Sequence, residues 1–111
     1  MSYVPARGDV VWLEFDPQAG HEQARRRPAL VLSPLDYNRR VGLALVCPIT
    51  SQVKGYPFEV AVPAGAPELH GVILADQVKS LDWHARRAAL LGRVPDSTVG
   101  EVVGLIGRLL Y

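Results

Sequence analysis

Three groups of polar residues carry side chains suited to acid–base or phosphate chemistry. The first is the stretch GHEQARRRP, residues 20–28, in which Glu22 precedes Arg27 by five positions. A glutamate can accept a proton, and the planar arginine fork matches two phosphate oxygens. Pro28 biases Arg27 toward an extended backbone, which fixes the direction in which the chain leaves the loop. Two interpretations are open: a site that acts on a phosphate, or a salt bridge that orders a surface loop.

The second group lies in PITSQVKGYPFEV, residues 48–60. It combines hydroxyl, amide and ammonium groups with an aromatic ring, in Thr50, Ser51, Gln52, Lys54 and Tyr56. Aromatic rings stack on bases, and such polar groups contact phosphates and base edges, so this stretch is suited to single-stranded RNA. The alternative is a polar connection between two strands.

The third group interrupts the apolar stretch GVILADQVKSL, residues 71–81, at Asp76, Gln77 and Lys79. Gln77 and Lys79 also carry groups that suit RNA. Strand alternation offers a simpler reason for the pattern, with Val78 inside and its two neighbours outside.

The overall charge excludes a uniformly basic nucleic-acid-binding protein. The chain has 111 residues, with 12 Lys and Arg against 11 Asp and Glu, for a formal net charge of +1. Attraction to a polyanion must therefore come from a local patch. The arginines do cluster, at 25–27, 39–40 and 86–87. Length and a hydrophobic content of 49% predict one globular domain, residues 1–111.

Other kinds of site find little support in the sequence. The single cysteine, Cys47, lies in the apolar run LALVCPI and is expected to be buried and inert. His21, His70 and His84 are far apart, and no pair of residues has metal-ligand spacing, so no metal site is predicted. No apolar run approaches the roughly 20 residues that span a membrane, and the first residues do not resemble a signal peptide. We therefore expect a cytoplasmic protein without membrane contact.

Short apolar runs predict a mostly antiparallel β domain. Strands are expected over 8–16, 28–33, 42–49, 56–62, 71–81 and 87–94, the fifth bent near Asp76, with one helical turn over 34–40. Apolar residues at 99, 102, 103, 106, 109 and 110 predict a terminal helix. Asp96 or Ser97 could cap it, and Thr98 with Glu101 matches a capping box. Helices and strands do not alternate, so the expected fold is a small barrel closed or covered by this helix.

Together these blocks resemble a known family. GDVVWLEFDPQAGHEQARRRPALVLSP, residues 8–34, matches a pattern of a G-D start, a D-P turn, G-x-E-Q, and R-P before an apolar strand. PITSQVKGYPFEV and GVILADQVKSLDW match later blocks of that family. The chain is identified as a member of the MazF/PemK family of toxin endoribonucleases, and it resembles the MazF branch itself.

This resemblance implies both a fold and an activity. The fold is mainly β with α, a small SH3-like antiparallel barrel (the MazF/CcdB-like toxin fold) with a C-terminal helix, acting as a homodimer. The activity is that of a type II toxin: sequence-specific cleavage of single-stranded mRNA without metal or cofactor, which inhibits translation and growth. The implied protein partner is a MazE-like antitoxin. By analogy, Arg27 and Thr50 fall at catalytic positions, with Glu22 as an acid–base partner.

Further residues of the same blocks are predicted RNA contacts, namely Gln23, Arg25, Arg26, Ser51, Gln52, Lys54, Tyr56, Gln77 and Lys79. The expected reaction is attack by the RNA's own 2′-hydroxyl, which leaves 2′,3′-cyclic phosphate and 5′-hydroxyl ends. The identity of the base is open among Glu22, His21 (where the family often has serine) and Arg27, although a guanidinium rarely gives up its proton. Two rivals also fit the fold: a toxin that inhibits a protein by binding alone, and an RNA-binding barrel without catalysis.

Overall fold

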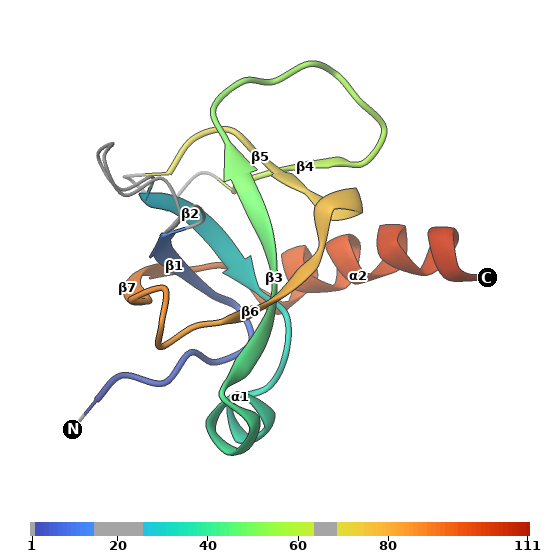
Figure 1. Ribbon diagram of the computed structural model, residues 1–111. Coiled ribbons are helices and arrows are strands. Elements are labelled where there is room, and N and C mark those ends of the chain that lie inside the picture. The colour runs from blue at the N-terminus through green and yellow to red at the C-terminus, as the bar shows by residue number, and fades with distance from the viewer. Residues whose placement is uncertain (1, 15–25, 64–68) are drawn as a thin grey trace.

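The computed structural model describes residues 2–14, 26–63 and 69–111 (Figure 1). In chain order the elements are β1 (Asp9–Glu14), β2 (Arg26–Val31), α1 (Leu35–Val41), β3 (Leu43–Thr50), β4 (Glu59–Ala61), β5 (Val72–Leu74), the 3-10 turn η1 (Ala75–Gln77), β6 (Lys79–Asp82), β7 (Ala89–Arg93) and α2 (Asp96–Leu110). The predicted strands and both predicted helical segments are thus present, with the fourth predicted strand reduced to three residues.

The strands form one curved antiparallel sheet of seven strands. Its order is β4-β5-β3-β2-β1-β7, and β6 pairs with β3 outside this path. The eight-residue β3 is the central strand, because it pairs with three others: β2, β6 and, near its end, β5. Among the described residues the two outermost strands, β4 and β7, do not pair with each other, so the sheet is barrel-like and open. This confirms the predicted mainly β fold with a C-terminal helix.

Side chains of the central strands alternate between two apolar clusters. Val10 and Leu30 belong to the cluster that α2 covers, whereas Val11, Ala29 and Val31 belong to the cluster on the other face. Successive strand residues point to opposite faces, so a strand with apolar residues at both phases is buried on both sides. The core therefore fixes the register of β1, β2 and β3, because a slip of one residue would exchange the two faces.

The terminal helix α2 packs half of its predicted apolar face on the core, through Val99, Val102 and Ile106. The other half, Val103, Leu109 and Leu110, is exposed. The predicted side-chain cap is wrong: Pro95 is the N-cap residue and makes no side-chain hydrogen bond. Thr98 instead lies buried inside the first turn, and its backbone N–H donates to the Pro95 carbonyl at 3.0 Å. No helix in the described ranges is long and apolar enough to cross a membrane.

The predicted bend near Asp76 is confirmed as the turn η1 between β5 and β6. The expectation that Val78 points inside is wrong, because its side chain is 36% exposed. The 3-10 turn replaces the extended backbone over 75–77, so the two-residue alternation of a strand does not continue through this segment.

Candidate functional site

Two neighbouring strands bring the predicted catalytic residues together. β2 and β3 run antiparallel with Ala29 opposite Pro48. The pairing ends there, and Arg27 and Thr50 lie two residues further on, near the start of β2 and at the end of β3. Both residues line the same two hollows. The fold therefore brings an arginine and a hydroxyl that are 23 positions apart in the chain to one place.

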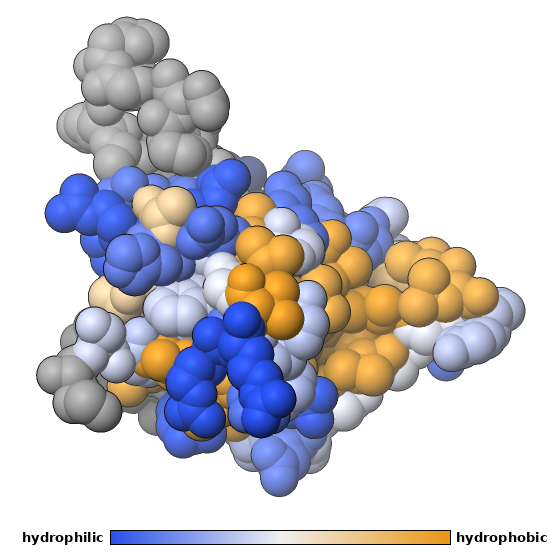
Figure 2. All heavy atoms as spheres, turned by 60° about the horizontal axis from the view of Figure 1, so that its bottom comes forward, coloured by the Kyte–Doolittle hydropathy of each residue, from blue (hydrophilic) through white to orange (hydrophobic). Residues whose placement is uncertain are grey.

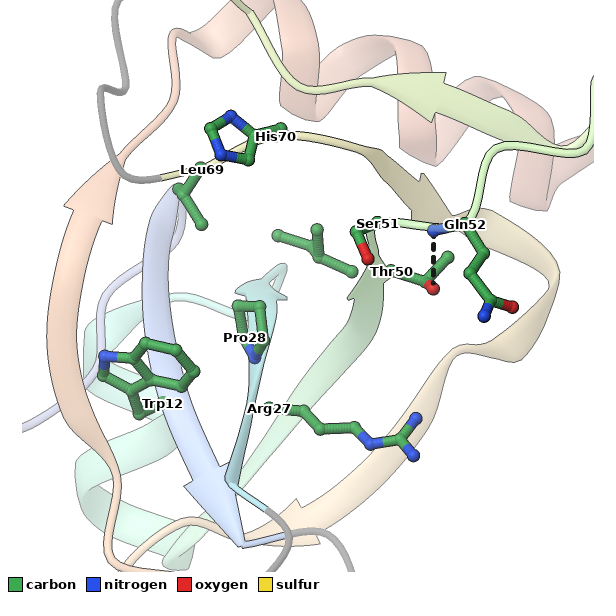
Figure 3. Close-up of a pocket in the computed structure, with 9 residues that line it drawn as sticks. Trp12, Arg27, Pro28, Thr50, Ser51, Gln52, Leu69 and His70 are labelled. Atoms are coloured by element: carbon green, nitrogen blue, oxygen red, sulfur yellow. Dashed lines mark hydrogen bonds between the residues drawn. The ribbon is translucent and has the colours of Figure 1, made fainter.

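Arg27, Thr50 and Gln52 form a wall shared by two hollows. Hollow 1, of about 440 Å³, is completed by Trp12, Pro28, Ile49, Ser51, Leu69 and His70 (Figure 3). Hollow 2, of about 400 Å³, is completed by Lys54, Tyr56, Glu59, Leu74, Asp76 and Gln77. In Figure 3 the Arg27 side chain extends away from Trp12, toward the side on which Gln52 lies. Both volumes fall within the range of small-ligand sites.

Most of the predicted site residues that the structure describes lie on these hollows, namely Arg27, Thr50, Ser51, Gln52, Lys54, Tyr56 and Gln77. Arg26 and Lys79 line neither hollow. In the sheet register Arg26 lies opposite Glu14 of β1, and Lys79 lies opposite Val46 of β3. The remaining predicted residues, Glu22, Gln23 and Arg25, lie outside the described residues, as does His21.

Glu59 holds the backbone of the loop 51–58, which carries four of the nine predicted RNA contacts. Its two carboxylate oxygens accept the backbone N–H groups of Lys54, at 3.2 Å, and Gly55, at 3.0 Å. Its own N–H donates to the Tyr56 carbonyl at 3.1 Å, so the segment 54–59 is tied into a closed turn. Gly55 has a φ of +76°, a value that L side chains rarely adopt. One carboxylate thus orders the loop beside hollow 2.

Tyr56 and Asp76 form a polar pair in hollow 2. The tyrosine hydroxyl donates to Asp76 Oδ2 at 2.9 Å, and this hydrogen bond together with the negative charge of Asp76 raises the pKa of Tyr56. The Tyr56 ring also lies 5.9 Å from Phe58, centroid to centroid, with a 50° tilt. Asp76 Oδ1 is buried and has no hydrogen-bond partner among the described residues. The pair orients an exposed aromatic ring at the edge of the hollow.

A close backbone approach fixes the segment that borders hollow 1. Gly71 has a φ of +117°, and a Cβ added there would overlap the Thr50 carbonyl oxygen and lie 2.8 Å from the Thr50 carbonyl carbon. Only glycine fits such a conformation and approach. The neighbouring His70 is therefore held beside Thr50 and Ser51.

The sequence alone did not single out several residues of the two hollows. Trp12, Leu69 and His70 of hollow 1 come from outside the three polar groups, and Glu59 and Leu74 of hollow 2 lie within the second and third groups but were not predicted as site residues. Trp12 stands in an apolar strand pattern, which by itself predicts a core residue. No local sequence pattern could have indicated that Trp12 lines a hollow, because strand pairing with β2 brings its neighbour Pro28 beside it.

The comparisons with known proteins agree with this geometry. The family model of PemK-like, MazF-like toxins of type II toxin–antitoxin systems matches residues 6–110. The chain belongs to this toxin family. The endoribonuclease toxin MazF of Escherichia coli (strain K12) is 54% identical over 108 residues, which cover 97% of this chain and 96% of that protein. The endoribonuclease PemK of Escherichia coli is 35% identical over 107 residues, covering 94% and 80%.

Solved structures of the same toxin family superpose closely on this chain. A MazE–MazF crystal structure (form II) from Deinococcus radiodurans aligns with a TM-score of 0.91 and 56% identity, covering 98% of this chain and 97% of that chain. MazF alone from the same organism aligns with a TM-score of 0.88, also at 56% identity, covering 98% of each chain. The family and fold predicted from the sequence are both confirmed.

The other arginine clusters of this MazF-like toxin chain lie off the hollows. Arg39 and Arg40 on α1 make exposed ion pairs with Asp36, at 3.6 and 3.3 Å. Arg86 donates to the Glu14 carbonyl at 3.0 Å, which ties the turn before β7 to the end of β1. These contacts give both clusters a role in local structure.

Proposed function

We propose that this protein is the toxin of a type II toxin–antitoxin system and a sequence-specific endoribonuclease that cleaves single-stranded mRNA without a metal ion. Cleavage of mRNA inhibits translation and growth. The observation that carries the proposal is that Arg27, near the start of β2, and Thr50, at the end of β3, both lie on the wall between two hollows. Relatives named as endoribonucleases, at up to 54% identity over nearly the whole chain, support the activity.

The proposed reaction uses the substrate's own nucleophile. A base removes the proton of a ribose 2′-hydroxyl, the oxygen attacks the adjacent phosphorus, and the 5′-oxygen leaves with a proton. The products are a 2′,3′-cyclic phosphate and a 5′-hydroxyl end. Proton transfer by a positioned group contributes about 10²–10⁴-fold, and stabilising the charge that develops on the phosphorane oxygens is often the larger effect.

Each proposed catalytic residue has a distinct role in this reaction. Arg27 suits charge stabilisation, because its planar fork can bind two phosphoryl oxygens at once. Thr50 adds a hydroxyl that can donate to the same phosphoryl group, and Glu22 is the proposed base. In the described structure the Thr50 hydroxyl oxygen accepts the Gln52 N–H at 3.2 Å, so its own proton is available to a phosphate.

RNA contacts are proposed on both sides of the shared wall. Ser51 lies on hollow 1, and Lys54, Tyr56 and Gln77 lie on hollow 2. These groups suit unpaired RNA, whose bases are exposed for stacking and for hydrogen bonds to their edges. Gln23, Arg25, Arg26 and Lys79 are proposed as outer contacts, together with Gln52 on the wall itself. Arginine and lysine contacts to phosphates weaken as salt rises.

We propose two protein partners for the single domain 1–111. One is a MazE-like antitoxin, supported by the MazE–MazF crystal structures of relatives. The other is a second copy of the chain, supported by an apolar hollow of about 650 Å³ under α2 whose walls include Leu45, Val78, Val103 and Leu110. Figure 2 shows apolar side chains gathered over the part of the molecule from which α2 projects. Because the proposed substrate is mRNA, we place the action of the toxin in the cytoplasm.

The decisive experiment is cleavage of a long unstructured RNA by the purified protein in EDTA. We expect discrete cuts with cyclic phosphate and 5′-hydroxyl ends, loss of cutting in Arg27→Ala, and no cut where a 2′-deoxy nucleotide replaces the reacting one. Arg39→Ala, on exposed α1, is the matched control and should cut like the unaltered protein. Intact RNA from a folded, antitoxin-free sample would reject the enzymatic proposal and favour a toxin that acts by binding alone.

A further inference from the structure

Hollow 1 differs in character from hollow 2. Its described lining combines the apolar side chains of Trp12, Pro28 and Leu69 with the imidazole of His70 and holds no carboxylate. Hollow 2 contains the carboxylates of Glu59 and Asp76. Among the described lining residues, a polyanion therefore meets acidic side chains in hollow 2 and none in hollow 1.

Trp12 is placed as a flat wall of hollow 1. It pairs across the strands with Pro28 and is only partly buried, although it lies in the centre of β1. In Figure 3 the two rings stand side by side along one edge of the hollow. The Trp12 indole N–H has no acceptor among the described residues, whereas that of Trp83 donates to the Asn38 carbonyl at 2.9 Å. Trp12 thus offers a ring face together with an indole N–H that no described residue accepts.

His70 stands at the rim of the same hollow (Figure 3). Its position is set by the close packing of Gly71 on the Thr50 backbone. The His70 side chain is exposed, and its ring nitrogens have no hydrogen-bond partner among the described residues. A ligand in hollow 1 would therefore find an aromatic face on one side and a polar ring on another, both next to Arg27 and Thr50.

We propose that hollow 1 is a base-binding subsite, in which Trp12 stacks on a nucleobase and His70 hydrogen-bonds to its edge. The phosphate to be cut lies at the wall of Arg27 and Thr50, so the nucleotides on its two sides occupy different hollows. Hollow 1 takes one of them, and hollow 2 takes the other. This inference rests on the proposed ribonuclease function and adds to it a second position at which the protein recognises a base of the RNA.

Substitutions at Trp12 and His70 test the subsite through binding. Stacking contributes about 1–3 kcal/mol per base by alanine substitution, so Trp12→Ala should raise KM about 5- to 150-fold at unchanged kcat. Trp12→Phe, which keeps a ring, should restore most of the binding. His70→Ala should relax base preference at a single position of the cut sequence. His84→Ala, an exposed histidine away from both hollows, is the matched control and should change neither KM nor base preference.

Fluorescence tests the contact itself without disturbing Trp12. The chain has two tryptophans, so Trp83→Phe leaves Trp12 as the only reporter and Trp12→Phe leaves only Trp83. Binding of a 2′-deoxy oligonucleotide that contains the cut sequence should quench the first protein and not the second. Unchanged Trp12 emission at saturating oligonucleotide would overturn the proposal.

The outcomes separate this inference from the proposed function. If the unaltered protein cuts RNA, and folded Trp12→Ala keeps its KM and folded His70→Ala its base preference while Trp12 emission is unaffected by the oligonucleotide, the subsite is wrong and the ribonuclease stands. If no variant and no wild-type sample cuts RNA, the proposed function itself fails. Normal RNA binding by His70→Ala with weakened binding of an antitoxin peptide would also overturn the subsite, in favour of a protein-docking role.

Discussion

The substitution Glu59→Gln tests whether the Glu59 carboxylate holds the loop 51–58 in the conformation that binds RNA. Glutamine has nearly the same shape but keeps only one acceptor oxygen, and its amide N–H₂ would face one of the two loop N–H groups. One of the hydrogen bonds to Lys54 and Gly55 is then lost, and the other becomes a neutral bond. A neutral hydrogen bond is roughly half as strong as one to a charged group.

The magnitude follows from these two bonds. Losing one bond to a charged group and weakening the other removes about 1–2 kcal/mol, taking the low end of the usual range because both bonds are exposed. That corresponds to about a 5- to 30-fold shift from the ordered toward the open loop. When only the ordered loop binds, the apparent affinity falls with its population. We therefore expect KM for RNA to rise by up to about 30-fold, with kcat nearly unchanged.

Two measurements check this reasoning. Hydrogen exchange at the Lys54 and Gly55 amides should accelerate by a factor similar to the rise in KM, while the unfolding temperature stays close to that of the unaltered protein, because the loop lies outside the core. Glu101→Gln, an exposed glutamate on α2, is the matched control and should alter neither quantity. If amide exchange at both positions is the same in Glu59→Gln and the unaltered protein, the carboxylate does not order the loop and the argument is refuted.

Three further predictions follow from the described contacts. Gly71→Ala should destabilise the fold by about 2–5 kcal/mol in denaturant unfolding, since it combines backbone strain with overlap on Thr50; an unchanged midpoint would contradict the packing. Because Asp76 raises the pKa of Tyr56, the stabilisation from this pair should be complete below the ordinary tyrosine pKa and lost as pH rises through the raised value. Ultraviolet titration should accordingly show the Tyr56 midpoint falling in Asp76→Asn, and no fall would count against the pair. Burial, and then the charge of Asp76, raise the pKa of the Cys47 thiol to about 12, so a disulfide reagent at pH 8 should react with it only after unfolding. Rapid reaction of the native protein would contradict this.

The parts of the fold that were predicted correctly depend on local patterns. Apolar runs bounded by turn residues located the strands, and the 3.6-residue period located α2. The cap of α2 was predicted wrongly, because Thr98 and Glu101 fit a capping pattern while Pro95 already begins the helix and the core buries the Thr98 side chain. The orientation of Val78 was also wrong, since a 3-10 turn upsets strand alternation, and no composition signal marks such a turn.

The candidate site, like the fold, could be predicted only in part from the sequence. Residue types and their order predicted that 20–28 and 48–60 carry the chemistry, because arginine, hydroxyl, amide and aromatic groups are visible in the sequence. Of these, Arg27 of β2, Thr50 of β3 and the predicted residues of the loop 51–58 do meet at the two hollows. The roles assigned to them, including those of Glu22 and its neighbours, remain proposals that the substitutions above test.

The sequence by itself determined the family, the mainly β fold and the chemical character of the residues near Arg27, because local patterns of residue type are enough to indicate each of these. Tertiary structure alone decided which residues face one another. Strand pairing sets Trp12 opposite Pro28, Arg27 and Thr50 line the same hollow, and the approach of Gly71 carries His70 to the same place. Such pairings join residues far apart in the chain, and they are fixed by the burial of two apolar faces at once, which no local stretch of sequence contains.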